Sequence, residues 1–349
     1  DAIEANARTV LDRALAYETQ IQMHVSRQNL PAALGACRAA LGQLGSPIPE
    51  RADTRHVLKE LATTKLALRG KGEEDLVNRP PLTDPRLLTI GRIVSRVLAS
   101  AYLHDTNLYT VLLLRMVRLS ATEGILPASG ITYATYGLLH CAMLGDVPAG
   151  AMYGRVALRV LDRLNANQGR AQTLFVVKLF IEVWHQPVAK ALSGLLDAHR
   201  IGLETGDIEY AAYCLNNAIA QGLFLGHPLR QLQQTAANHA AAIGRLNQQT
   251  AAGVLRPHQQ LIANLLGESE DPTAFAGPHV TEASDVPALA ASGNRLALDT
   301  MHSHLAYLNL LFGRIDEARR CIAKRRPFAD ASMGMVMNLR MRVVAALID

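Results

Sequence analysis

The chain has 349 residues, of which 49% are hydrophobic and 5% aromatic, and its formal net charge is +5. Its basic and acidic residues are interspersed, so it lacks the clustered Lys/Arg face that a nucleic-acid partner requires. Alanine and leucine are abundant and alternating runs of β-branched residues are scarce, which favours helices over strands.

The four cysteines, Cys37, Cys141, Cys214 and Cys321, lie far apart, and none has the spacing of a metal site. We expect buried free thiols in a reducing compartment, a cytoplasmic location, and no metal or other cofactor. No apolar run reaches about 18 residues, so we expect no membrane span. The chain begins at Asp1, which predicts a piece of a longer protein.

The first 50 residues predict a tetratricopeptide-like hairpin. Residues 1–30 carry apolar side chains at helical spacing, and Pro31 suits the first turn of a second helix. This second helix covers residues 32–44, and its small alanine and glycine side chains allow close packing against a neighbouring helix.

Two aspartates mark the starts of later helices. Asp53 or Thr54 can cap a helix over residues 55–69. Asp84 and Pro85 have the pattern of a cap followed by the first helical residue, after a proline-containing connector. That helix runs to about residue 103, and another is expected over residues 107–123.

Helix pairs continue to residue 266. The expected helices cover residues 131–144, 149–164, 169–185, 188–204, 207–225, 228–247 and 248–266. Short turns such as Gly206-Asp207 join them, and the pairs recur at roughly 35 to 45 residues. We therefore predict an all-α fold, a TPR-like α–α superhelix that forms a single domain over residues 1–349. A compact helical bundle is the alternative.

The helical pattern is interrupted once, over residues 267–285, where acidic residues, prolines and Gly277 show no period. We expect an irregular loop or a partly disordered insertion there. Residues 286–349 then form C-terminal TPR-like helices, with a tetratricopeptide-style turn at Gly313.

Candidate binding residues fall on two helical stripes, because positions three, four or seven apart share one face of a helix. The first stripe contains Tyr210, Tyr213, Asn217 and Gln221. The second contains Tyr133, Tyr136 and His140. Aromatic, amide and imidazole groups suit a pocket for a small polar ligand or a peptide. The alternative is that the tyrosine rings pack between helices.

Trp184, the only tryptophan, ends a helix before Pro187. It is either a core anchor between repeats or a contact for a protein partner. His302 and His304 are two positions apart, so on a helix they point to different faces and do not form a metal site.

Several phrases, in this order and spacing, carry a resemblance to a known family. They occupy residues 66–71, 74–76, 82–85, 116–120, 136–139, 144–146, 202–213 and 264–267. Together they resemble the helical-repeat region of large multidomain signalling proteins. Those proteins combine a Ser/Thr-kinase-like domain, a predicted ATPase of the STAND/AAA type, the helical repeats, GAF or PAS sensors and a sensor histidine kinase. The resemblance covers about residues 30 to 267.

The resemblance implies a regulatory module between an ATPase and the kinase output of a two-component system. No Walker A motif, kinase catalytic loop or phosphoacceptor context is present, so we expect a module that is not an enzyme. Its expected partners are other domains of the same polypeptide, a protein or peptide, or a small-molecule effector. A passive intramolecular scaffold or oligomerisation module without a ligand is the alternative, and an all-α lyase or hydrolase with an internal cavity is a third.

Overall fold

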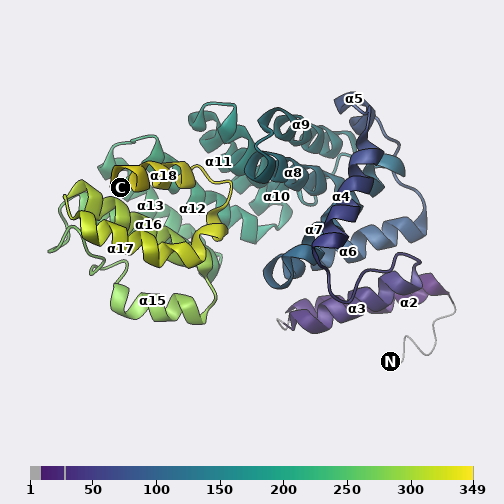
Figure 1. The fold of residues 1–349 in the computed structure, drawn as a ribbon, viewed down its shortest axis with the longest axis horizontal. Helices are drawn as coiled ribbons and strands as arrows, with labels where there is room; N and C mark the ends of the chain where they lie inside the picture. Colours follow the sequence, from purple (N-terminus) through teal and green to yellow (C-terminus); the bar gives the residue numbers. More distant parts are fainter. Residues whose placement is uncertain (1–8, 27–28, 349) are drawn as a thin grey trace. The chain divides into compact units, whose positions relative to one another are not determined.

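The computed structural model describes residues 9–26 and 29–348 (Figure 1). Across this part of the chain the regular structure is helical, and the only β contacts are two isolated bridges, Pro81 with Ile125 and Ala276 with Thr281. The all-α prediction is confirmed. Residues 1–8 and 27–28 of the predicted N-terminal hairpin lie outside the described residues.

The chain divides into two compact units. The N-terminal unit contains Asp1–Gly137 and Met152–Gly169, and the C-terminal unit contains Leu138–Ala151 and Arg170–Asp349. The boundaries fall inside two helices, because residues 138–151 belong to the second unit.

The N-terminal unit consists of six helices and most of two more. They are α2 (Val10–Ser26), α3 (Leu30–Gln43), α4 (Thr54–Leu68), α5 (Glu73–Val77), α6 (Pro85–His104), α7 (Thr106–Thr122), α8 (Ser129–Leu139) and α9 (Val147–Arg163). The helix starts follow the sequence: Asp84 accepts a hydrogen bond from the Arg86 amide at 2.8 Å, with Pro85 as first residue. Asp53 likewise accepts from the His56 amide at 3.0 Å.

Helix α4 packs against α7 rather than against its neighbour in the sequence, while α6 packs against α2 and α3. The contact between α4 and α7 contains a nearly buried carboxylate, Glu60, which lies 2.7 Å from Arg115 and 2.6 Å from Arg118. The hydroxyl of Thr64 donates to the Leu114 carbonyl at 3.1 Å. These polar contacts fix how the two helices pair, because each buried group needs its partner.

The C-terminal unit continues as pairs of consecutive helices. Its elements are η1 (His140–Leu144), α10 (Arg170–Val176), η2 (Val177–Ile181), η3 (Glu182–Trp184), α11 (Val188–Thr205), α12 (Ile208–Phe224), α13 (Leu229–Arg245), α14 (Gln249–Leu265), α15 (Glu282–Ala291), α16 (Arg295–Leu311), α17 (Ile315–Arg325), η4 (Arg326–Ser332) and α18 (Met337–Ile348). Three pairs, α11–α12, α13–α14 and α16–α17, pack together as in an α solenoid. Gly206 (φ 78°) turns the chain between α11 and α12, as predicted.

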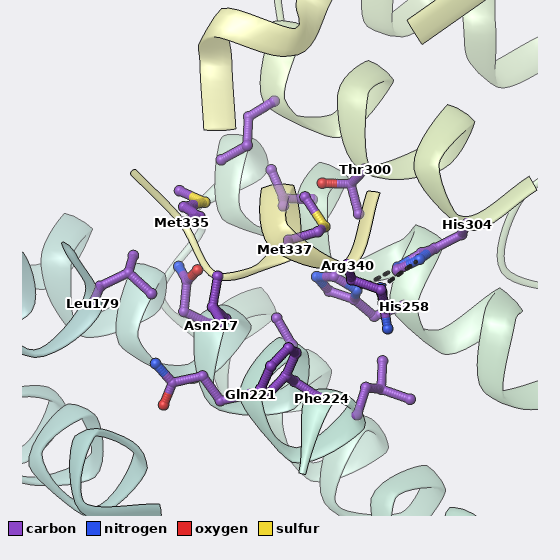
Figure 2. Close-up of a pocket in the computed structure, with 15 residues that line it drawn as sticks. Leu179, Asn217, Gln221, Phe224, His258, Thr300, His304, Met335, Met337 and Arg340 are labelled. Atoms are coloured by element: carbon purple, nitrogen blue, oxygen red, sulfur yellow. Dashed lines mark hydrogen bonds between the residues drawn. The ribbon is translucent and has the colours of Figure 1, made fainter. Parts of the chain in front are cut away.

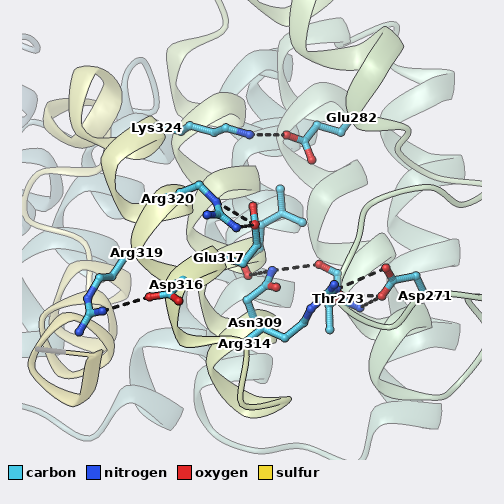
Figure 3. A network of polar contacts seen from close by, with 11 residues as sticks. Asp271, Thr273, Glu282, Asn309, Arg314, Asp316, Glu317, Arg319, Arg320 and Lys324 are labelled. Carbon is cyan, nitrogen blue, oxygen red and sulfur yellow. Dashed lines mark hydrogen bonds and ion pairs between the residues drawn. The ribbon is translucent and has the colours of Figure 1, made fainter.

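Buried amides hold the irregular segment after α14. The Asn264 side chain donates to the carbonyls of Pro272 and Ala274 at 3.0 and 2.7 Å. Figure 3 shows Asn309 and Arg314 meeting Thr273 from the α16–α17 hairpin, and the Asn309 amide donates to the Thr273 carbonyl at 3.0 Å. These bonds give the segment a defined path although it lacks regular structure.

None of the helices in residues 9–26 and 29–348 combines the length and the apolar character that a membrane crossing needs. The four cysteines are buried and unpaired, as the sequence predicted.

Candidate functional site

Two residues of the α12 stripe lie in an aromatic cluster. The rings of Tyr210 and Tyr213 are 5.7 Å apart, and both contact Phe175, at 5.5 and 6.1 Å between centroids. Gln172 donates to the Tyr210 hydroxyl at 2.8 Å, and the Tyr213 hydroxyl donates to Glu209 at 2.7 Å. These two tyrosines therefore have the contacts of packing residues.

The tyrosines of the second stripe also pack against another ring. Tyr153 lies 6.3 Å from Tyr133 in a stacked arrangement and 4.7 Å from Tyr136 edge to face. Tyr133 is fully buried, which raises the pKa of its hydroxyl. His140 lies in the C-terminal unit, where its Nδ1 is 3.6 Å from Asp146.

Trp184 is half-buried, and its indole N–H is buried without an acceptor among the described residues. It lines a groove of about 880 Å³ in the C-terminal unit, together with Met143, Leu144, Met333 and Leu339. These four apolar side chains are between 45% and 65% exposed, so the groove presents an accessible apolar surface. We call it the methionine groove.

Asn217 and Gln221, the remaining residues of the α12 stripe, line a small pocket in the same unit (Figure 2). The polar side chains of the pocket are Asn217, Gln221, His258, Thr300, His304 and Arg340. Its apolar side chains include Leu179, Phe224, Val254, Leu296, Met335 and Met337. The remaining space is about 30 Å³, enough for roughly two water molecules.

Helices α12, α14, α16 and α18, the element η2 and one turn contribute residues to this pocket. Helix α12 supplies the two amides, α14 supplies His258, and α16 supplies Thr300 and His304. Met335 and Val336, of the turn over residues 333–336, and Met337 and Arg340 of α18 complete the wall. This turn is the only part of the described pocket wall that is not helical, so it is the part that can move with the least loss of hydrogen bonds.

His258, His304 and Arg340 form a hydrogen-bonded chain on one side of the pocket, and the amides of Asn217 and Gln221 lie on the other (Figure 2). The Arg340 guanidinium lies 3.4 Å from His304 Nδ1, and His304 Nε2 lies 2.7 Å from His258 Nδ1. Arginine can only donate, so His304 accepts at Nδ1 and carries its proton on Nε2. His258 then accepts at Nδ1 and carries its proton on Nε2.

Burial keeps both imidazoles neutral. It lowers the pKa of His258 to about 3, with a smaller contribution from the nearby Arg340 charge. Burial, followed by His258 and Arg340, lowers the pKa of His304 well below 6.5. The single full charge in the pocket is therefore the Arg340 guanidinium.

Two polar groups of the pocket lack partners among the described residues. Both amide atoms of Gln221, which is 1% exposed, have no hydrogen-bond partner, and the buried Nε of Arg340 has no acceptor. The ring of Tyr307 lies 5.1 Å from the guanidinium carbon of Arg340. None of the fifteen described residues that line the pocket carries a carboxylate. The pocket wall thus contains one positive charge and several polar side chains, while most of the surface that faces the open space is apolar.

Arg325 holds both ends of the turn over residues 333–336. Its guanidinium donates to Ser332 Oγ at 3.3 Å and to the Asn338 side chain, while Nε lies 2.8 Å from the buried Asp299. The Asn338 amide in turn donates to the Ser332 carbonyl at 2.6 Å. Gly334, with φ at 81°, lies between these fixed ends.

Sequence reasoning missed the charged side of the pocket. His258, His304 and Arg340 come from three helices, and helical periodicity shows only that a position faces inward. His302 and His304 do point to different faces of α16, as predicted, and both are buried: His302 stacks on Phe328, at 6.2 Å between ring centroids. In the part of the chain that the structure describes, no group of three or more His, Cys, Asp or Glu side chains could hold a metal ion.

The fold defines an all-α protein of helix pairs, and its C-terminal unit contains a small pocket lined by both apolar and polar side chains. No family model matches the chain. Over 145 residues, 41% of the chain, it is 23% identical to a Dictyostelium discoideum protein named hybrid signal transduction histidine kinase G. The match covers 4% of that relative's length. The chain is therefore similar, over part of its length, to a signalling protein.

Proposed function

We propose that the chain is a regulatory, non-catalytic helical module of a signalling protein. It binds a small effector in the pocket of the C-terminal unit and passes the bound state to neighbouring domains and a kinase output. The partial similarity to a histidine kinase supports the signalling context.

The observation that carries the proposal is the pair of buried polar groups without partners. More than about nine in ten buried polar groups in proteins are hydrogen-bonded, because an unsatisfied one costs about 1–3 kcal/mol. The side-chain amide of Gln221 and the Nε of Arg340 lack such partners among the described residues, and both side chains line the same small space. A ligand that occupies this space supplies the missing partners.

The turn over residues 333–336 supports the relay. Met335 lines both the pocket and the methionine groove, so the turn separates the two. A space of about 30 Å³ is too small for most effectors, so binding displaces the turn and changes the groove surface. Methionine-rich apolar surfaces adapt to protein partners, which suits the groove for a neighbouring domain.

Thermal unfolding of the purified chain against a library of small acids, amines and neutral compounds tests the proposal. A ligand at 100 times its dissociation constant should add about 2.7 kcal/mol to the free energy of unfolding. Hydrogen exchange at residues 333–340 should change with the same ligand. If no compound of any charge class stabilises the chain, the proposed function is wrong.

A passive scaffold is the second candidate, and the packing of the tyrosine stripes favours it, since four predicted binding residues contact other rings. The two candidates differ in their response to substitution. In the full-length protein, Asn217→Leu should abolish the response of kinase output to an effector if the module senses. A scaffold would leave that output unchanged while the chain stays folded.

A further inference from the structure

We infer that the pocket binds a small monocarboxylate with an apolar body, whose carboxylate is held by the Arg340 guanidinium. This inference rests on the proposed function of the pocket as an effector site. It names the chemical class of the effector, which neither the fold nor the comparisons assign.

The pocket has one positive charge and no negative charge among its described residues, so a ligand with one anionic group would neutralise it. Among the described residues, Arg340 is the only charged side chain that lines the pocket, and no carboxylate is found to pair with it. A planar guanidinium presents donors in a fork that matches the two oxygens of a carboxylate. The Nε–H of Arg340 is buried and has no acceptor among the described residues, so it can donate to one carboxylate oxygen once a ligand displaces the groups that cover it.

Of the two neutral imidazoles beside Arg340, His258 keeps one N–H that is not used in the hydrogen-bonded chain. Since His304 accepts from Arg340, the proton order along the chain leaves His258 with an N–H at Nε2. Because both imidazoles are neutral, neither pairs with the guanidinium as strongly as a carboxylate ligand would. The lowered pKa values of both histidines agree with this order.

The rest of the wall selects an apolar body with a single charge. Phe224, Val254, Leu296, Met335 and Met337 surround the polar chain. A phosphate ester or a dicarboxylate would bury a second negative charge for which the pocket has no cation, at a large desolvation cost. A short alkyl or aryl acid has only one charge to pair. Its apolar body fills the space that opens when the flexible side chains of Met335 and Met337 move aside.

Isothermal titration of the intact chain measures the predicted selectivity. The probes are acetate, butyrate, hexanoate and benzoate, with hexanamide, hexylamine and chloride as comparisons. We expect hexanoate or benzoate to bind at least about ten times more tightly than hexanamide or hexylamine, since a charge-assisted bidentate pair exceeds a neutral hydrogen bond. Affinity should rise from acetate to hexanoate as more apolar surface is buried.

Two variants and a matched control assign the effect to Arg340. Arg340→Met should lower the affinity for hexanoate at least tenfold, and Arg340→Lys should lower it less, because lysine keeps the charge without the fork. Arg245→Met, at an exposed position of α13, should bind as the unmodified chain does. Circular dichroism confirms that each variant is folded.

The outcomes separate the inference from the function on which it rests. If neutral or cationic compounds bind and the carboxylates do not, the inference is wrong and the proposed function stands. Equal binding of hexanoate by Arg340→Met overturns the role of Arg340, and equal binding of chloride, acetate and hexanoate overturns the apolar body. If no probe or library compound binds, both proposals fail.

Discussion

Replacing Arg340 by methionine should make the C-terminal unit more stable when no ligand is bound. Arg340 is half-buried, its Nε is fully buried, and its charge has no carboxylate partner among the described residues; this burial lowers its pKa. Methionine keeps an unbranched apolar stem of similar length, so it fills the same space without the charge.

The expected gain follows from three opposing contributions. Removing a partly buried charge that has no carboxylate partner relieves part of a desolvation penalty that reaches several kcal/mol for a fully buried ion. The contact with the Tyr307 ring, lost in the variant, contributes about 1–2 kcal/mol. The long hydrogen bond to His304 contributes no more than about 1 kcal/mol. The balance is a gain of about 1 kcal/mol or more, which raises the midpoint by about 2–4 °C in a unit of this size.

The assay uses the fluorescence of Trp184, the only tryptophan, which lies in the C-terminal unit and reports its unfolding in urea. Arg245→Met is the control, and its free energy of unfolding should stay within about 0.5 kcal/mol of the unmodified value. If Arg340→Met instead loses more than about 1 kcal/mol, the arginine stabilises the fold, and the argument from its unpaired charge is refuted.

Three further predictions concern groups with different partners. Glu60→Gln should lower the stability of the N-terminal unit by about 1–3 kcal/mol in denaturation followed by circular dichroism, because two arginines lose their carboxylate; no loss would show that the pair contributes nothing. Tyr133→Phe should leave stability unchanged or raise it by up to about 1 kcal/mol, since the buried hydroxyl has no partner among the described residues; a clear loss would contradict this. The free energy of unfolding, followed by Trp184 fluorescence, should fall as the pH drops from 6.5 toward about 3. In this range His258 and His304 bind protons in the unfolded chain but stay neutral when buried in the folded one. The slope is up to about 1.4 kcal/mol per pH unit for each histidine, and His258→Gln should flatten it.

The sequence was most informative where a local rule fixes the backbone. Asp84 with Pro85 and Gly206 were read correctly, because a cap and a left-handed turn depend on residues within four positions of each other. The pairing of α4 with α7 was not foreseen, since it depends on Glu60 meeting two arginines more than fifty positions away.

For the pocket too, the sequence predicts the residues that lie on one helix but not those that meet from different helices. The spacing of Asn217 and Gln221 predicts one face of one helix, and the structure places both on the pocket wall. Arg340 could not be placed from the sequence, because its surroundings come from helices that end 75 or more positions earlier and from α16. Its isolation from carboxylates is a property of the assembled unit and has no local signature.

The fixed ends of the turn over residues 333–336 have an entropic consequence. Closing a flexible loop costs about 0.6 kcal/mol more for each doubling of its length. Because Arg325 holds both Ser332 and Asn338, only a few residues gain freedom when the turn opens. The displaced turn therefore has few alternative conformations, so its displacement by an effector changes the conformational entropy of the chain only slightly.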